Sequence, residues 1–141
     1  MSDPARLLAW LLRLSGIAML PAFAAAMLPL DWMAASHAWL GLGSLPREPI
    51  VEYLARSISL LYGIHGVLLL VVARDVRRHA TVIRYVGTVD IGFGAAMIAI
   101  DLNAGLPDWW TLGEGPPIAV CGLIVLALLR ATTARSTAAP G

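Results

Sequence analysis

Four long apolar stretches, separated by short polar connections, constrain this chain more than any other feature. They cover residues 6–30, 50–73, 81–102 and 111–131. A helix needs about 20 residues to cross the roughly 30 Å of hydrocarbon in a bilayer. Hydrophobic residues make up 59% of the chain and charged residues only 13%, a balance unlike that of soluble domains. The sequence therefore predicts an all-α, polytopic membrane protein that folds as a four-transmembrane-helix bundle.

The short connections leave no room for a separate soluble module, so we expect residues 1–141 to form one transmembrane domain. The longest connection, residues 31–49, has the length of a loop or a short interfacial helix. Counted from Pro116, the last apolar stretch is short for a span. Either residues 109–115 dip into the interface or Thr132 and Thr133 extend the helix at its other end.

Arginine sets the orientation, because the chain has ten arginines and no lysine. Seven of them gather at the start of the first stretch, around the second connection and at the end of the last stretch or beyond it: Arg6, Arg74, Arg77, Arg78, Arg84, Arg130 and Arg135. The first connection is mixed in charge, and the third carries only acidic residues. By the positive-inside rule, both termini are cytoplasmic. This rule alone explains the basic rim, which is also suited to anionic lipid headgroups.

The N-terminal stretch allows a second interpretation. Arg6, an apolar run and the small residues 22–26 resemble a secretory signal with its cleavage site. Arg13 interrupts the apolar run, however, and Pro21 divides it. We favour a retained first span with a kink at Pro21, and the cleaved signal stays as the alternative.

Ionisable residues within the spans form a predicted inner network. At about 1.5 Å of rise per residue, Arg13, His65 and Asp90 all fall roughly 3 to 8 Å to the cytoplasmic side of their span midpoints. A charge in hydrocarbon is costly unless it is paired or hydrated. We therefore expect Arg13 to pair with Asp90, with His65 adjacent and Tyr62 part of the same network.

A second polar cluster is expected towards the outer surface. Glu52 and Arg56 are four residues apart and can pair along one helix, and Arg56 can also reach Asp101. A stripe with small residues should face the bundle on the third span: Ile83, Gly87, Asp90, Gly94 and Asp101. Two interpretations of the polar clusters stay open: ion pairs that fix helix packing, or a site for a proton, an ion or a lipid headgroup.

Tryptophans are concentrated in the predicted outer connections. Trp109 and Trp110 lie close to Glu114, and interfacial anchoring explains them without any ligand. The alternative is that they form, beside Asp108 and Glu114, the mouth of an amphipathic pocket. Pro116 is expected in the first helical turn, which would place Glu114 near a helix N-terminus. The single Cys121 excludes a disulfide within the chain, and no ligand spacing predicts a metal site.

The chain resembles the small four-span bacterial membrane proteins of the DoxX-like group. The resemblance rests on size, on the basic connection at residues 74–84 and on Gly115, Pro116 and Pro117 before the last span. It implies a bacterial inner-membrane protein. Some members of that group are associated with quinone-linked sulfur oxidation, but no residue of this chain matches a catalytic motif.

These observations favour a non-enzymatic accessory protein, or a helix bundle that binds a small ligand or lipid. The main alternative is a small quinone-linked redox subunit, in which quinone would be the cofactor. A second alternative is a component of a proton-coupled transporter. The expected partners are the lipid bilayer and further subunits, either copies of this chain or those of a larger membrane complex, with no nucleic acid.

Overall fold

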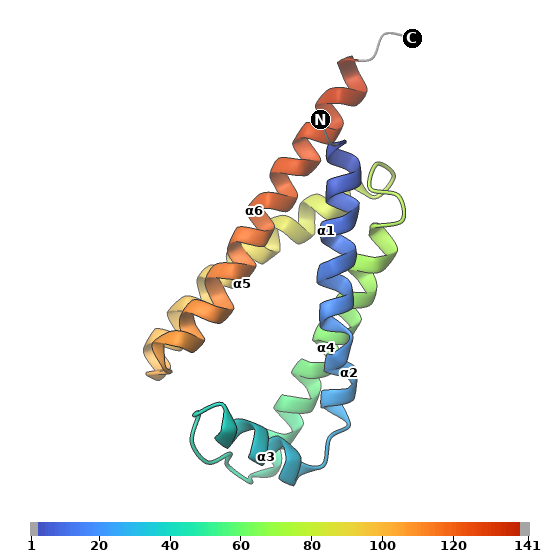
Figure 1. Cartoon of the computed structure of the whole chain (residues 1–141). Coiled ribbons are helices and arrows are strands. Elements are labelled where there is room, and N and C mark those ends of the chain that lie inside the picture. Colours follow the sequence, from blue (N-terminus) through green and yellow to red (C-terminus); the bar gives the residue numbers. More distant parts are fainter. Residues whose placement is uncertain (1–2, 139–141) are drawn as a thin grey trace. The chain divides into compact units, whose positions relative to one another are not determined.

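The computed structural model describes the backbone of residues 3–138 and the side chains of residues 3–134. The side chain of Arg135 therefore lies outside the described residues. The described chain is helical and contains no strand. Its elements, in order, are α1 (Pro4–Met19), α2 (Pro21–Ala26), α3 (Leu30–Trp39), α4 (Pro49–Val72), α5 (Ala80–Ala104) and α6 (Asp108–Ala138) (Figure 1).

Four helical segments are long and apolar enough to cross a membrane. They are Pro4–Ala26, Pro49–Val72, Ala80–Ala104 and Asp108–Ala134. These segments agree with the four predicted spans to within a few residues at most ends. Only 17–22% of each apolar window is buried within the chain. Exposed apolar surface on this scale requires a nonaqueous surrounding, so the four segments indicate a multi-pass membrane protein.

Pro21 divides the first span into two helices at Leu20, which itself keeps a right-handed helical conformation. Proline has no backbone N–H and cannot donate to the carbonyl of Ile17, four residues earlier. The Leu20 N–H donates to that carbonyl instead, over 3.2 Å, in a tighter turn. α1 therefore ends at Met19, and α2 begins at Pro21, a position that a helix N-terminus tolerates.

The last span begins earlier than predicted, so the expectation that Pro116 lies in its first turn is wrong. Pro116 and Pro117 lie inside α6, because the helix begins at Asp108 and continues past Thr133. The carbonyl of Pro107 accepts hydrogen bonds from the N–H groups of Trp110 and Thr111, which closes the first turn well before the prolines. Glu114 is therefore an interior helix residue and not part of the helix N-terminus.

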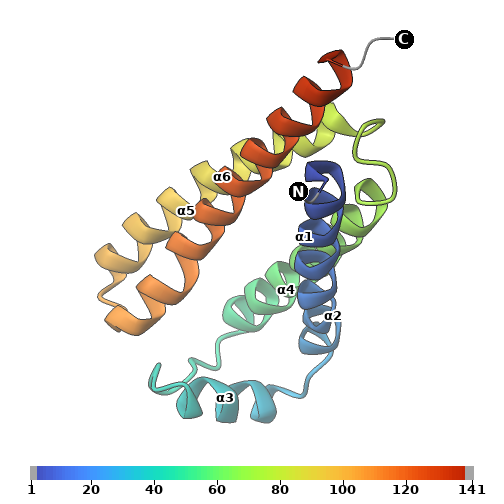
Figure 2. The same ribbon diagram turned by 45° about the horizontal axis from the view of Figure 1, so that its top comes forward.

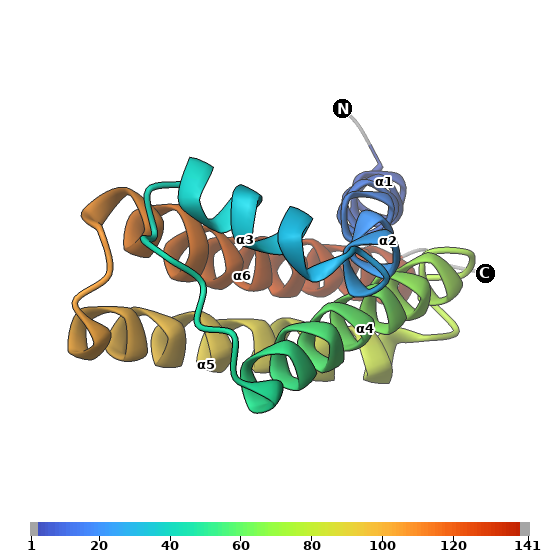
Figure 3. The same cartoon turned by 90° about the horizontal axis from the view of Figure 1, so that it is seen from below.

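The first connection contains the short helix α3, one of the two forms predicted for it. An extended segment then leads to α4, as Figure 3 shows. Arg47 of this segment pairs with Asp31 of α3 over 2.9 Å, and both side chains are exposed. The ion pair links the two ends of the first connection at the surface of the protein.

Contacts divide the chain into two units, Leu14–Leu70 and a second that combines residues before and after this range. The whole-chain domain predicted from sequence stays a prediction. In the first unit, Gly16 and Gly66 bring the first span and α4 into backbone contact. A Cβ atom added at either glycine would lie 2.8 Å from the carbonyl oxygen of the other. One turn earlier on α4, Gly63 lies against the ring of Phe23.

In the second unit, α5 and α6 form an antiparallel hairpin and lie side by side in Figure 1 and Figure 2. Gly105 ends α5 in the left-handed conformation, at φ 67°, where glycine is favoured. Gly94 faces Gly115, and a Cβ atom at Gly94 would lie 2.5 Å from the Gly115 carbonyl oxygen. Seven residues along each helix, Gly87 faces Gly122. Small residues thus let the two backbones touch.

The predicted stripe on the third span faces this contact. The buried residues of α5 are Ile83, Val86, Gly87, Gly94 and Asp101. Four of the five predicted stripe residues are therefore buried, and Asp90, the fifth, is half-buried. The three- and four-residue spacing in the sequence was sufficient to find the packed face of α5.

A bulky residue at Gly94 should separate the hairpin. Gly94→Leu places atoms where the α6 backbone lies, and overpacking of this kind costs about 1–3 kcal/mol. Gly92→Leu is the matched control on the same helix, because no atom lies within 4 Å of a Cβ added there. Thermal unfolding in detergent, followed by circular dichroism, should show a lowered midpoint for Gly94→Leu alone. Equal midpoints for both variants would contradict the glycine contact.

Candidate functional site

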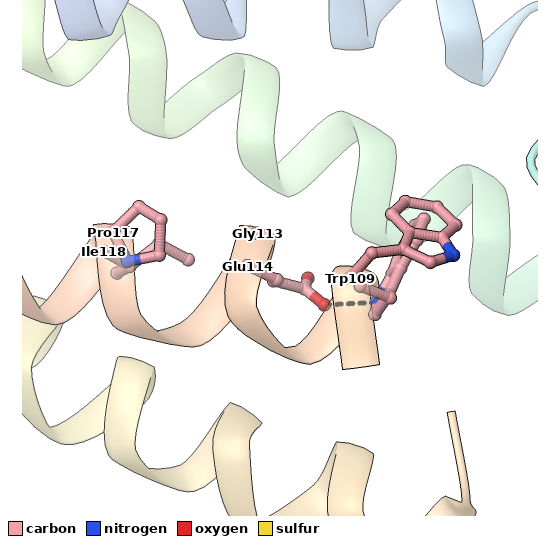
Figure 4. A pocket seen from close by; sticks show the side chains of 6 residues that line it. Trp109, Gly113, Glu114, Pro117 and Ile118 are labelled. Atoms are coloured by element: carbon pink, nitrogen blue, oxygen red, sulfur yellow. Dashed lines mark hydrogen bonds between the residues drawn. The ribbon is translucent and has the colours of Figure 1, made fainter. Parts of the chain in front are cut away.

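The first three turns of α6 build an aromatic and acidic pocket. Trp109 and Trp110 are in T-shaped contact, with ring centroids 5.5 Å apart. The indole Nε1–H of Trp110 donates a hydrogen bond to Glu114 Oε2 over 2.7 Å. The four-residue spacing places the indole and the carboxylate on one face of the helix. Figure 4 shows the Glu114 side chain directed back towards the turn that carries Trp109.

This pocket has a volume of about 370 Å³, within the range of small-molecule sites. Its lining residues are Trp109, Trp110, Gly113, Glu114, Pro117 and Ile118. All of them lie on α6, so the pocket belongs to one helix of the hairpin. It has an open side, where Trp109 is 52% exposed. The sequence indicated Trp109, Trp110 and Glu114 as candidate residues of this pocket, but it did not indicate that Pro117 lines the pocket.

Pro117 frees one backbone acceptor at the pocket. It cannot donate to the carbonyl of Gly113, a lining residue that lies four residues earlier in the helix. Glu114 adds a carboxylate, which can accept further hydrogen bonds besides that from Trp110. The pocket therefore combines aromatic faces with acceptor oxygens. Such a surface is chemically suited to a cationic group or to a donor.

The predicted outer cluster contains the Glu52–Arg56 ion pair. The Arg56 guanidinium donates to Glu52 Oε1 from Nε over 2.9 Å and from Nη2 over 2.8 Å. It also donates to the backbone carbonyls of Ala26 and Leu28. Sequence reasoning missed these carbonyl contacts. They satisfy acceptors that the C-terminal end of α2 leaves without helical partners.

Asp101, the third predicted member of the cluster, is 1% exposed. Its Oδ2 atom and the Oγ1 atom of the buried Thr111 have no hydrogen-bond partner among the described residues. A buried polar atom without a partner is costly and requires an explanation. The predicted contact between Arg56 and Asp101 stays a prediction.

For the residues of the predicted inner network, the structure gives their burial and one contact of Arg13. His65 and Tyr62 are half-buried on α4, and Asp90 is half-buried on α5. Arg13 is exposed, and its guanidinium lies 5.9 Å from the centroid of the Trp10 ring, a cation–π contact. The pairing of Arg13, His65 and Asp90 stays a prediction. Among the described residues, no group of three histidine, cysteine or acidic side chains could hold a metal ion.

At the opposite end of the α5–α6 hairpin lies a second pocket that the sequence reasoning did not identify. It has a volume of about 150 Å³ and is lined by Arg84, Thr88, Leu126, Leu129, Arg130 and Thr133. The arginine–threonine spacing, four residues on α5 and three on α6, is the signal that could have indicated it. The pairing of the two helices, however, is needed to bring the four polar residues together.

Comparisons with known proteins do not assign this chain to a family. No family model matches this chain, and no curated protein or solved structure is significantly similar to it.

Arg56 should stabilise the fold more than the exposed Arg47 does. Arg56→Ala removes the donors to two backbone carbonyls and leaves Glu52 unpaired, which should cost about 1–3 kcal/mol in unfolding free energy. The side chains of Arg56 and Glu52 are 31% and 38% exposed, against 66% and 78% for Arg47 and Asp31. Arg47→Ala should therefore cost less than about 1 kcal/mol.

Reversible unfolding in mixed micelles, with increasing sodium dodecyl sulfate, measures both free energies under the same conditions. If Arg47→Ala destabilised the protein as much as Arg56→Ala, the carbonyl contacts of Arg56 would contribute nothing beyond its charge.

Proposed function

We propose that this chain is a non-enzymatic, multi-pass protein of a bacterial inner membrane that binds a small amphipathic cation at the Trp109–Glu114 pocket. The observation that carries the proposal is the Trp110–Glu114 hydrogen bond within a pocket of about 370 Å³. It fixes a carboxylate beside two indole rings. Both termini lie in the cytoplasm in this proposal, so the pocket opens at the outer end of the last span. The bacterial origin rests on the DoxX-like resemblance, which is itself part of the proposal.

Charge complementarity selects the ligand class. A cation over an indole ring is attracted by the ring quadrupole, typically by about 0.5–2 kcal/mol depending on desolvation. The Glu114 carboxylate adds a full negative charge beside the rings. Pro117 and Ile118 supply an apolar wall for an alkyl portion of the ligand. An ammonium group attached to a short apolar chain satisfies all three features.

Interfacial anchoring alone accounts less well for this arrangement. A tryptophan anchor directs its N–H towards water and headgroups at the membrane boundary. Trp110 instead donates its N–H to Glu114, so this donor is used within the pocket. An anchor also needs no acceptor-rich backbone, whereas Pro117 leaves the Gly113 carbonyl without its helical donor.

The same chemistry disfavours a quinone at this pocket. The carbonyl oxygens of a quinone need hydrogen-bond donors, and of the two indole N–H groups in the lining that of Trp110 is already donated to Glu114. The redox alternative would therefore depend on the region of Tyr62, His65 and Asp90. Proton-coupled transport stays a prediction that depends on the same residues. Neither alternative has support comparable to that for the aromatic pocket.

A decyltrimethylammonium titration tests the binding site. Calorimetry on the full chain in lipid nanodiscs should give a saturable isotherm, and Glu114→Gln should weaken binding about tenfold or more, because a charged contact is lost. Asp108→Asn is the matched control, since this exposed residue lies on the same helix outside the pocket. The uncharged carbon isostere of the ligand should bind poorly. Equal binding by Glu114→Gln and the native chain would contradict the proposal.

Cysteine labelling tests the orientation. In a Cys121→Ala background, Ser44→Cys in the first connection should react with a membrane-impermeant maleimide added to intact cells. Arg77→Cys in the second connection should react only after the membrane is opened, because positively charged connections stay in the cytoplasm. The opposite labelling pattern would reverse the proposed topology.

A further inference from the structure

The pocket between α5 and α6 has the chemistry of an anion site. Two arginines line it, Arg84 from α5 and Arg130 from α6. They are 46 residues apart in sequence, and only the antiparallel pairing of the hairpin brings them to one pocket. Each guanidinium carries a fixed positive charge and a planar set of N–H donors that matches phosphate oxygens.

A threonine accompanies each arginine. The Thr88 hydroxyl donates to the Arg84 carbonyl over 2.9 Å, and the Thr133 hydroxyl donates to the Arg130 carbonyl over 2.9 Å. Each helix therefore presents the same pair of side chains to the pocket, one guanidinium and one anchored hydroxyl. Because the hydroxyl hydrogens are used within the helices, the arginines supply the N–H donors for a ligand.

No acidic side chain lines the pocket. Within the described part of the chain, ion pairs are formed by Arg47 and Arg56, and neither Arg84 nor Arg130 belongs to one. The nearest acidic residue on α5, Asp90, lies outside the lining set. The lining thus contains two arginines and no acidic residue, a composition that favours an anionic ligand.

The apolar part of the lining indicates the source of the anion. Leu126 and Leu129 form the apolar part of the lining, so the pocket combines a basic and an apolar region. Arg84 lies four residues after the start of α5, about 6 Å at the helical rise, where a span meets the headgroup region. The volume of about 150 Å³ admits a phosphate with its adjoining carbons and is too small for a typical organic ligand.

We propose that Arg84 and Arg130, with Thr88 and Thr133, bind the phosphodiester of an anionic phospholipid, whose acyl region lies along Leu126 and Leu129. This site shares no lining residue with the tryptophan pocket and does not depend on the cation proposed there. The positive-inside rule requires arginines in this region, but it does not require two of them, on different helices, to share one pocket with two hydroxyls.

Native mass spectrometry of the full chain in neutral detergent tests the proposal. Titration with phosphatidylglycerol should give one adduct of higher affinity than the rest, and phosphatidylcholine should bind more weakly because its ammonium group opposes the two arginines. The Arg84→Gln, Arg130→Gln variant should lose about tenfold or more in affinity for the first phosphatidylglycerol. Arg77→Gln, Arg78→Gln is the matched control, with the same change in charge outside the pocket.

The control should change the affinity by less than about threefold. An equal loss in both double variants would overturn the site in favour of general attraction to the basic rim. Inorganic phosphate should neither bind with comparable affinity nor displace the lipid, since it lacks the acyl region. If it did so, the pocket would be a site for free phosphate and the lipid assignment would be wrong.

If the glutamine variant fails to fold, Arg84→Lys with Arg130→Lys keeps both charges but removes the planar donor set. This variant should still bind phosphatidylglycerol several-fold more weakly than the native chain. Unchanged affinity in the lysine variant would overturn the role of the guanidinium groups.

Discussion

Hydrocarbon offers a helix no hydrogen-bond partner and no hydrophobic reward for packing against another helix. Both consequences are evident in this protein. Its backbone polar groups are satisfied largely within helices, and only 17–22% of each apolar window is buried. Close packing must then come from complementary helix surfaces. Glycines allow the helix backbones to approach closely where Gly16 meets Gly66 and where Gly94 meets Gly115. At these positions the contact is between backbones, so that any larger side chain would replace attraction with overlap.

Where a helix is interrupted, backbone carbonyls lose their helical hydrogen-bond donors and need other polar partners. Where the first span ends, the carbonyls of Ala26 and Leu28 lack helical donors, and the Arg56 guanidinium reaches both of them from α4. Where Pro117 enters α6, it leaves the Gly113 carbonyl without its helical donor, at a pocket whose lining contains no arginine. The first arrangement is complete within the chain and is structural. The second lies at the open pocket in which the Trp110–Glu114 hydrogen bond carries the functional proposal.

Sequence patterns predicted what depends on local order. The four spans follow from apolar length, the packed face of α5 from spacing, and the Glu52–Arg56 pair from a separation of four residues. The position of Pro116 was predicted wrongly because proline favours a first helical turn, and the turn closed by Pro107 starts the helix earlier. The pocket at Arg84 and Arg130 was missed because it depends on the register between two helices, which neither segment specifies alone.

That register has a simple origin. Gly94 meets Gly115 and Gly87 meets Gly122, so seven residues forward on α5 correspond to seven residues back on α6. Continued in one direction, this pairing brings Arg84 to the part of α6 that carries Leu126 and Arg130. Continued in the other, it leads to Asp101 and to the turn that begins α6 at Asp108. A slip of one residue would turn the contacting face of the slipped helix by about 100°, since a turn has 3.6 residues. The glycines therefore determine which polar side chains can meet at the cytoplasmic end proposed here, although they bind nothing themselves.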